Sequence, residues 1–206
     1  PINWSSPAHI LEKIITYESV HEIENWDDLR RRLQPEDRRC FAFFHPAMPD
    51  EPLIFVEVAL TKGTPNSIQS VLLENRDAMA AEKADTAAFY SISNCQAGLA
   101  GISFGNSLIK TVVQHLLREL PQIRNFVTLS PIPGLVKWLR ETGNFDADAT
   151  AETHRQLAAH YLLNAKHRNG QPRDPVARFH LNNGALVDAV HANADKSKNG
   201  MAQSCG

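Results

Sequence analysis

The chain has 206 residues, of which 43% are hydrophobic and 21% are charged, a balance typical of a globular protein and not of a disordered one. Its 21 basic and 23 acidic residues leave a formal charge of −2, so it lacks the basic excess that usually accompanies nucleic-acid binding. No apolar run reaches the roughly 18–20 residues of a membrane span. We therefore expect neither nucleic acid nor a membrane among its partners.

Two short helices are predicted at the start of the chain. Ser6 and Pro7 suit the N-cap and the first position of a helix whose apolar residues recur at helical spacing over residues 10–15. A second helix is predicted over residues 26–33, and Pro35 stops it.

Three strands are predicted next. Residues 40–44 are a compact aromatic run, and residues 52–60 are rich in Leu, Ile, Phe and Val, as expected of a long buried strand. The two are predicted to face each other across a hairpin-like connection at residues 45–51. Residues 86–93 are the best candidate for a central strand.

A glycine-containing segment follows that central strand. Gly98, Gly101 and Gly105 precede an amphipathic helix whose apolar face spans residues 108–120, and the next strand is predicted over residues 125–130. Strand, glycine segment, helix and strand in this order predict a β-α-β unit.

The rest of the chain is predicted to hold a helix carrying Trp138, a helix over residues 154–166, and a last strand over residues 176–181 that is turned by residues 182–184. Residues 196–206 are polar and small. The whole pattern predicts an α+β fold, with α/β as the alternative: a mixed twisted sheet flanked by helices.

The glycine segment offers one chemical interpretation and one structural one. Glycines allow close approach of a ligand to the backbone, and the amides at the start of a helix favour an anion such as a pyrophosphate. Neither G-x-G-x-x-G nor a Gly-Lys-Ser/Thr sequence is present, so neither a Rossmann site nor a P-loop is supported. The alternative is a tight strand-to-helix turn.

Three blocks of sequence carry a resemblance to a known family. They are Phe89-Tyr90-Ser91-Ile92-Ser93 with Gly98-Leu99, Gly101, Gly105 and Leu108-Ile109-Lys110; Leu129-Ser130-Pro131-Ile132-Pro133-Gly134 with Trp138-Leu139; and Asp174-Pro175-Val176-Ala177, Phe179-His180-Leu181 and Asn183-Gly184-Ala185. In this order, over most of the chain, they resemble the catalytic domain of malonyl-CoA decarboxylases.

The resemblance implies a Gcn5-related N-acetyltransferase fold and a reaction that converts malonyl-CoA to acetyl-CoA and CO2. It implies that the catalytic residues are Ser130 and His180, and that no metal or added cofactor is needed. The segment implied to hold the CoA pyrophosphate comprises Ala100, Gly101, Ile102, Ser103, Phe104, Gly105 and Asn106. Some family members carry a glutamate where this chain has Ser103, so a role for that carboxylate does not transfer.

Simpler interpretations stand beside these. Taken alone, Ser130 is a cap of the following turn, and His180 is a half-buried histidine of an apolar strand. No Gly-x-Ser-x-Gly sequence surrounds Ser130, so a hydrolase nucleophile is unsupported. His154, His160 and His167 do not share one helical face at ligand spacing, and no metal site is expected.

Other functions on the same scaffold remain alternatives: an acyl-CoA-dependent acyltransferase, or a non-catalytic CoA-binding regulatory domain. Several cationic residues are candidates for the CoA 3′-phosphate, with a solvated surface as the alternative for each: Lys110, Arg118, Lys166, His167 and Arg168. The three cysteines indicate free thiols of a reducing compartment. Cys95 is expected to be a buried small residue, with a reactive thiol as the alternative.

We expect residues 1–206 to form a single catalytic domain in the cytoplasm, linked to fatty-acid metabolism, with a homo-oligomer left open. By the resemblance, this domain is a fragment that lacks an N-terminal helical domain and a C-terminal segment with an active-site tyrosine. The stretch from Glu141 to His154 is shorter than in many family members.

Overall fold

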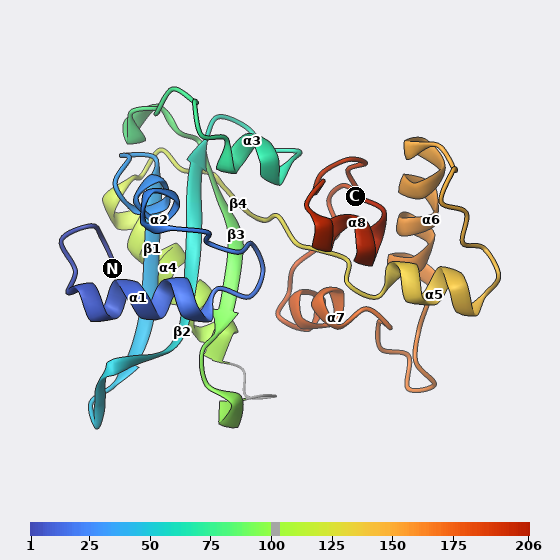
Figure 1. Ribbon diagram of the computed structural model, residues 1–206, viewed down its shortest axis with the longest axis horizontal. Helices are drawn as coiled ribbons and strands as arrows, with labels where there is room; N and C mark the ends of the chain where they lie inside the picture. The colour runs from blue at the N-terminus through green and yellow to red at the C-terminus, as the bar shows by residue number, and fades with distance from the viewer. Residues whose placement is uncertain (100–103) are drawn as a thin grey trace. The chain divides into compact units, whose positions relative to one another are not determined.

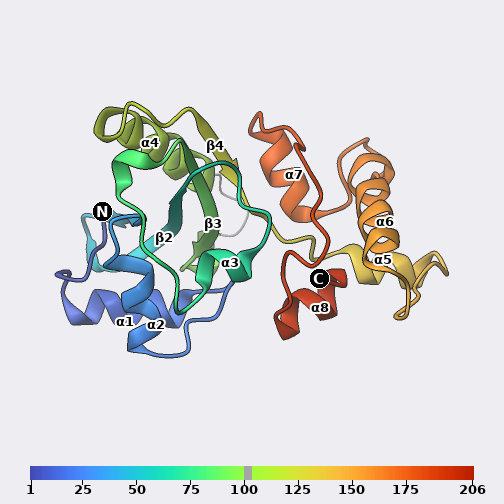
Figure 2. The same cartoon turned by 90° about the horizontal axis from the view of Figure 1, so that it is seen from above.

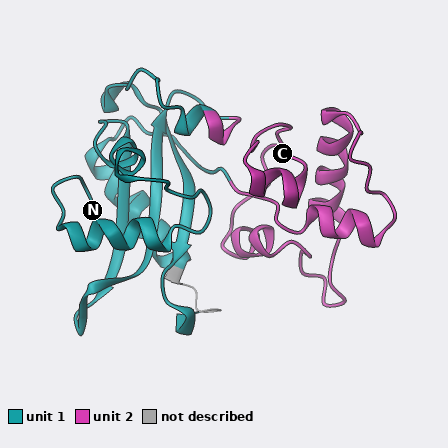
Figure 3. Cartoon of the chain, in the orientation of Figure 1, with its two compact units in different colours: residues 1–65, 70–129 teal, residues 66–69, 130–206 magenta. Residues whose placement is uncertain are grey.

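The computed structural model describes residues 1–99 and 104–206, and these divide into two compact units (Figures 1 and 3). The first unit comprises Pro1–Pro65 and Ser70–Leu129, and the second comprises Asn66–Gln69 and Ser130–Gly206. That residues 1–206 act as one catalytic domain stays a prediction.

The first unit is built on a four-stranded mixed sheet. Its strands, in spatial order, are β1 (Arg38–His45), β2 (Met48–Thr61), β3 (Thr86–Asn94) and β4 (Asn125–Thr128). The pairs β1–β2 and β2–β3 are antiparallel, whereas β3 and β4 are parallel and are joined through α4 (Phe104–Glu119). The predicted β-α-β unit and the α+β class are confirmed.

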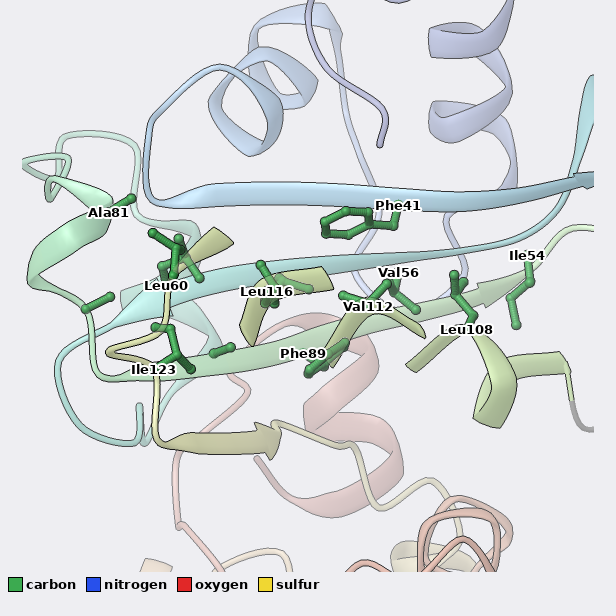
Figure 4. Close-up of a cluster of buried hydrophobic side chains, with 14 residues drawn as sticks. Phe41, Ile54, Val56, Leu60, Ala81, Phe89, Leu108, Val112, Leu116 and Ile123 are labelled. Carbon is green, nitrogen blue, oxygen red and sulfur yellow. The ribbon is translucent and has the colours of Figure 1, made fainter. Parts of the chain in front are cut away.

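Helices cover both faces of this sheet (Figure 2). On one side α4 presents Leu108, Val112 and Leu116, which recur every four residues and pack on the sheet in the core of Figure 4. On the other side lie α1 (Ala8–Tyr17) and α2 (Trp26–Leu33), which pack on residues such as Phe55. Because both faces are covered, β2 is buried without interruption from residue 54 to residue 60.

Two predictions about the first unit are wrong in detail. The hairpin connection is shorter than expected, because β1 runs to His45 and β2 begins at Met48. Ser6 is not the N-cap of the first helix. Pro7 holds that position without a side-chain bond, and Ser6 Oγ instead accepts the backbone N–H of Asn3 at 3.1 Å.

Short helical turns complete the first part of the chain, namely α3 (Ile68–Leu72), η1 (Ala81–Lys83) and η2 (Ala97–Leu99). The second unit contains α5 (Leu135–Glu141), α6 (Ala151–Asn164), α7 (Pro175–Asn182) and α8 (Lys198–Ser204). Its core lies around Leu135, Leu139, Ala158, Tyr161 and Leu162, which come from α5 and α6.

The predicted last strand over residues 176–181 is wrong, because this segment is helix α7. Asp174 is its N-cap and accepts hydrogen bonds from the N–H groups of Val176 and Ala177, and Pro175 occupies the first helical position. A short apolar run does not by itself distinguish strand from helix. Here the Asp-Pro start favours the helix. Residues 196–206, which are polar and small, contain α8.

None of the helices in residues 1–99 and 104–206 has both the length and the hydropathy of a bilayer-crossing segment.

Candidate functional site

The structure brings Ser130 and His180 together within the second unit. Ser130 Oγ lies 3.1 Å from Nε2 of His180, a hydrogen-bonding distance between residues that are 50 positions apart in sequence. Ser130 is exposed and His180 is half-buried, so the pair is open to solvent on the serine side.

Ser130 stands directly after the last strand of the sheet. Residue Leu129 still bonds to the sheet, donating its N–H to the carbonyl of Phe89 at 2.9 Å, and Ser130 begins the turn that leads into α5. The N-cap of α5 is Gly134, which has no side chain to contribute. Ser130 is therefore not the cap of that helix, and its hydroxyl is directed to His180 instead.

His180 lies on α7 and not on a strand, which corrects the expected strand context of this residue. Its ring and the neighbouring Phe179 ring form a T-shaped pair, with an interplanar angle of 78° and a centroid distance of 5.0 Å. Burial lowers the pKa of His180 below its usual 6.5. The imidazole is thus neutral at pH 7, and one ring nitrogen can accept a hydrogen bond from the Ser130 hydroxyl.

Asp174 joins the segments that carry this pair. Its carboxylate is buried, with 1% of the residue exposed, and accepts three backbone N–H bonds. Two come from the first turn of α7, and the third comes from Gly134, at 3.2 Å. Burial raises the pKa of Asp174, while these three N–H groups act in the opposite direction.

Asp174 and Tyr161 received no role from the sequence. The signal for Asp174 is present in the sequence, since Asp-Pro before an apolar run is a helix start, whereas the apolar run taken alone favours a strand. Tyr161 lies on α6 and is 2% exposed, and burial raises its pKa to about 12. Nothing in the local sequence distinguishes it from an ordinary core tyrosine.

The predicted pyrophosphate segment belongs to the first unit. Of its residues, Ala100, Gly101, Ile102 and Ser103 lie outside the described residues, whereas Phe104, Gly105 and Asn106 form the first turn of α4. Its role in holding CoA stays a prediction. Cys95 precedes this segment and is buried as expected, and burial raises the pKa of its thiol to about 12.

Two candidates for the CoA 3′-phosphate line a pocket in the second unit. His167 and Arg168 line an open surface depression of about 640 Å³ together with Asn169 and Arg178, a residue of α7. Their role stays a prediction.

Two other candidate histidines make local contacts. His154 Nε2 lies 2.9 Å from the carbonyl oxygen of Asp146, and His160 Nδ1 lies 3.2 Å from the side-chain amide of Asn164. Across residues 1–99 and 104–206, no group of three or more His, Cys, Asp or Glu side chains is arranged to hold a metal ion.

Comparison with known proteins covers the whole chain. The family profile described as malonyl-CoA decarboxylase C-terminal domain matches residues 1–155 and 142–206. A curated relative, the mitochondrial malonyl-CoA decarboxylase of the goose Anser anser anser, is 40% identical over 252 residues, covering 100% of this chain and 50% of the relative. This chain spans about half the length of the curated relatives it matches.

Solved structures agree. A crystal structure of malonyl-CoA decarboxylase from Rhodopseudomonas palustris is 55% identical with a TM-score of 0.88, covering 98% of this chain and 56% of that one. The loading GNATL domain of CurA from Lyngbya majuscula is 16% identical with a TM-score of 0.55, covering 87% of this chain and 81% of that one. That likeness concerns the fold alone, and it confirms the expected acetyltransferase-like architecture.

Proposed function

This chain belongs to the malonyl-CoA decarboxylase family, and on that premise we propose that it catalyses the decarboxylation of malonyl-CoA to acetyl-CoA and CO2. The observation that carries the proposal is the hydrogen-bonding contact between Ser130 Oγ and His180 Nε2. The two residues are predicted to act together. They lie on different segments, so their contact does not follow from closeness in the sequence.

The substrate itself supplies the electron sink. When the bond between the carboxylate and the α-carbon breaks, its electron pair moves into the thioester carbonyl, CO2 leaves, and a thioester enolate remains. Protonation of the α-carbon then gives acetyl-CoA. The protein must therefore orient the malonyl carboxylate, stabilise the enolate oxygen and deliver one proton.

Ser130 and His180 are suited to the proton transfer. A neutral His180, whose pKa is lowered by burial, accepts the Ser130 hydroxyl proton at Nε2 and orients that hydroxyl. One of the two groups passes this proton to the α-carbon, and water on the exposed side of Ser130 returns a proton to the serine oxygen, so that each turnover consumes one proton from solvent. Positioned proton transfer of this kind contributes about 10²–10⁴-fold to rate.

The remaining parts of the proposal concern CoA binding, the cofactor requirement and the cellular location. Residues 100–106 hold the CoA pyrophosphate, with backbone amides near the start of α4 as donors. No metal or added cofactor takes part, because the thioester is itself the electron sink. We place the protein in the cytoplasm and link it to fatty-acid metabolism, although the curated relatives that it matches are named as mitochondrial.

The test measures CO2 and acetyl-CoA formed from malonyl-CoA, with a chelator present and no acyl acceptor added. We expect turnover that collapses in Ser130→Ala and in His180→Asn, with CoA binding reduced much less than rate. Turnover that depends on an acceptor would favour an acyltransferase. Tight binding of malonyl-CoA without turnover would favour a regulatory domain, and equal losses of rate and binding in His180→Asn would remove the proton-transfer role.

A further inference from the structure

One buried carboxylate connects the two segments that carry Ser130 and His180. Asp174 Oδ1 accepts the N–H groups of Val176 at 3.0 Å and Ala177 at 2.9 Å, at the start of α7. Its other oxygen, Oδ2, accepts the N–H of Gly134 at 3.2 Å. The first oxygen serves the helix of His180, and the second serves the turn that follows Ser130.

The second of these bonds is not required for helix capping. Asp, Asn and Ser are about equally good N-caps, and a buried carboxylate is costly unless its oxygens are hydrogen-bonded. An asparagine would cap α7 equally well with one oxygen. Only a carboxylate offers an acceptor on both branches, and here the second acceptor is used by Gly134.

Both segments that meet at Asp174 are stiff. From Gly134 back to Ser130 the chain contains Pro131 and Pro133, whose rings fix their φ angles. From Asp174 forward to His180 the chain is helical. A change in the distance between Gly134 and Asp174 is therefore transmitted to the far ends of both segments, where the Ser130 hydroxyl meets the His180 ring.

We propose that Asp174 is a positioning residue that sets the contact between Ser130 and His180 through its bond to the Gly134 N–H. Packing supports the same junction, because Ile132 of the turn and Ala177 of α7 contact one hydrophobic cluster. The catalytic consequence of this inference rests on the proposed function, whereas its structural consequence does not.

The sharpest test is Asp174→Asn, which keeps the capping oxygen for α7 and replaces the other oxygen with an NH2 group that cannot accept the Gly134 N–H. Two quantities are measured in the full chain: the pH titration of the His180 ring by NMR, and kcat with KM for malonyl-CoA. Ser197→Ala is the matched control. It removes the N-cap of α8 in the same unit, where Ser197 Oγ accepts the Gly200 N–H at 3.0 Å.

In the wild type, Ser130→Ala should shift the His180 titration, because it removes the hydrogen-bonding partner. In the Asp174→Asn background the same replacement should have almost no further effect, because the contact is already lost. We expect kcat to fall by about 10–10²-fold, as for a misplacement of about 1 Å, with KM nearly unchanged. Ser197→Ala should leave the titration and kcat as in the wild type.

The outcomes separate the two ideas. If folded Asp174→Asn keeps the wild-type titration and the wild-type kcat, Asp174 is only a helix cap and the inference is overturned, while the proposed function stands. If the titration changes as expected but the wild type does not convert malonyl-CoA, the positioning role stands and the proposed function fails. Should Asp174→Asn not fold, the same titration and kcat are measured in Asp174→Ser, which retains one capping oxygen. The two results are then interpreted in the same way.

Discussion

Gly134 and Tyr161 approach so closely that a Cβ atom on Gly134 would overlap the phenol oxygen of Tyr161 and lie 3.2 Å from Cζ of its ring. The backbone of Gly134, with φ −92° and ψ −7°, is open to any residue, so glycine is needed here for space and not for conformation. The turn after Ser130 thus packs directly on the core of the second unit.

The first prediction follows from this contact. Gly134→Ala should destabilise the protein by about 1–3 kcal/mol, the usual cost of overpacking a buried site. Tyr161→Phe removes the atom in conflict, so the double variant should recover most of the loss. Urea unfolding of the two single variants and the double variant measures the coupling. Additive losses would mean that the two side chains do not meet as described.

A second prediction concerns a buried glutamate in the sheet of the first unit. Glu57 is fully buried, its Oε1 has no hydrogen-bonding partner among the described residues, and its Oε2 lies 3.4 Å from Arg32. Burial, followed by the nearby Glu18 carboxylate, raises the pKa of Glu57 to about 8. Arg32 acts in the opposite direction but is bound more closely to Asp28, at 2.9 Å.

The folded state therefore holds a proton on Glu57 that the unfolded chain loses near pH 4.5. The associated stability is complete below that pH and is lost as the pH rises toward about 8. Relative to Glu57→Gln, the free energy of unfolding of the wild type should fall by about 1.4 kcal/mol per pH unit over this interval. Urea unfolding at pH 5.5, 6.5 and 7.5 measures it. The surface variant Glu119→Gln is the control, and a flat difference between wild type and Glu57→Gln would contradict the assignment.

A third prediction concerns the pH dependence of the reaction. Because burial lowers the pKa of His180, the acidic limb of kcat/KM should have its inflection below pH 6.5, where the imidazole becomes charged and can no longer accept the Ser130 hydroxyl proton. Protonation of His180 also makes the folded state less stable as the pH falls through the lowered pKa of His180. An acidic limb with its inflection above pH 6.5 would exclude neutral His180 as the group that controls it.

A fourth prediction concerns the cysteines. Cys40 and Cys95 are buried, and burial raises the pKa of both thiols, that of Cys95 to about 12. Cys205 is less buried; burial raises the pKa of its thiol too, while nearby Arg140 acts in the opposite direction. Iodoacetamide at pH 8 should modify Cys205 in the native protein and reach the other two only in urea, because the thiolate is the reactive form. Peptide mass spectrometry identifies the site, and early labelling of Cys95 would contradict this order.

Local patterns decided what could be predicted from the sequence. The apolar spacing of residues 108–120 identified α4, and the apolar runs identified β1, β2 and β3, because each pattern repeats with the period of its own element. The segment 176–181 was predicted wrongly because a short apolar run fits both periods. Its Asp-Pro start is a helix signal that outweighs the run.

The amino-acid sequence by itself determined the β-α-β unit, the α+β class and the pairing of Ser130 with His180 as candidates, since these depend on local periodicity and on blocks of sequence shared with a family. Only the tertiary structure decided the contact across 50 positions, the bond from Asp174 to Gly134 and the burial of Glu57. These contacts depend on how separate elements pack against one another, and a pattern within a single element does not predict them.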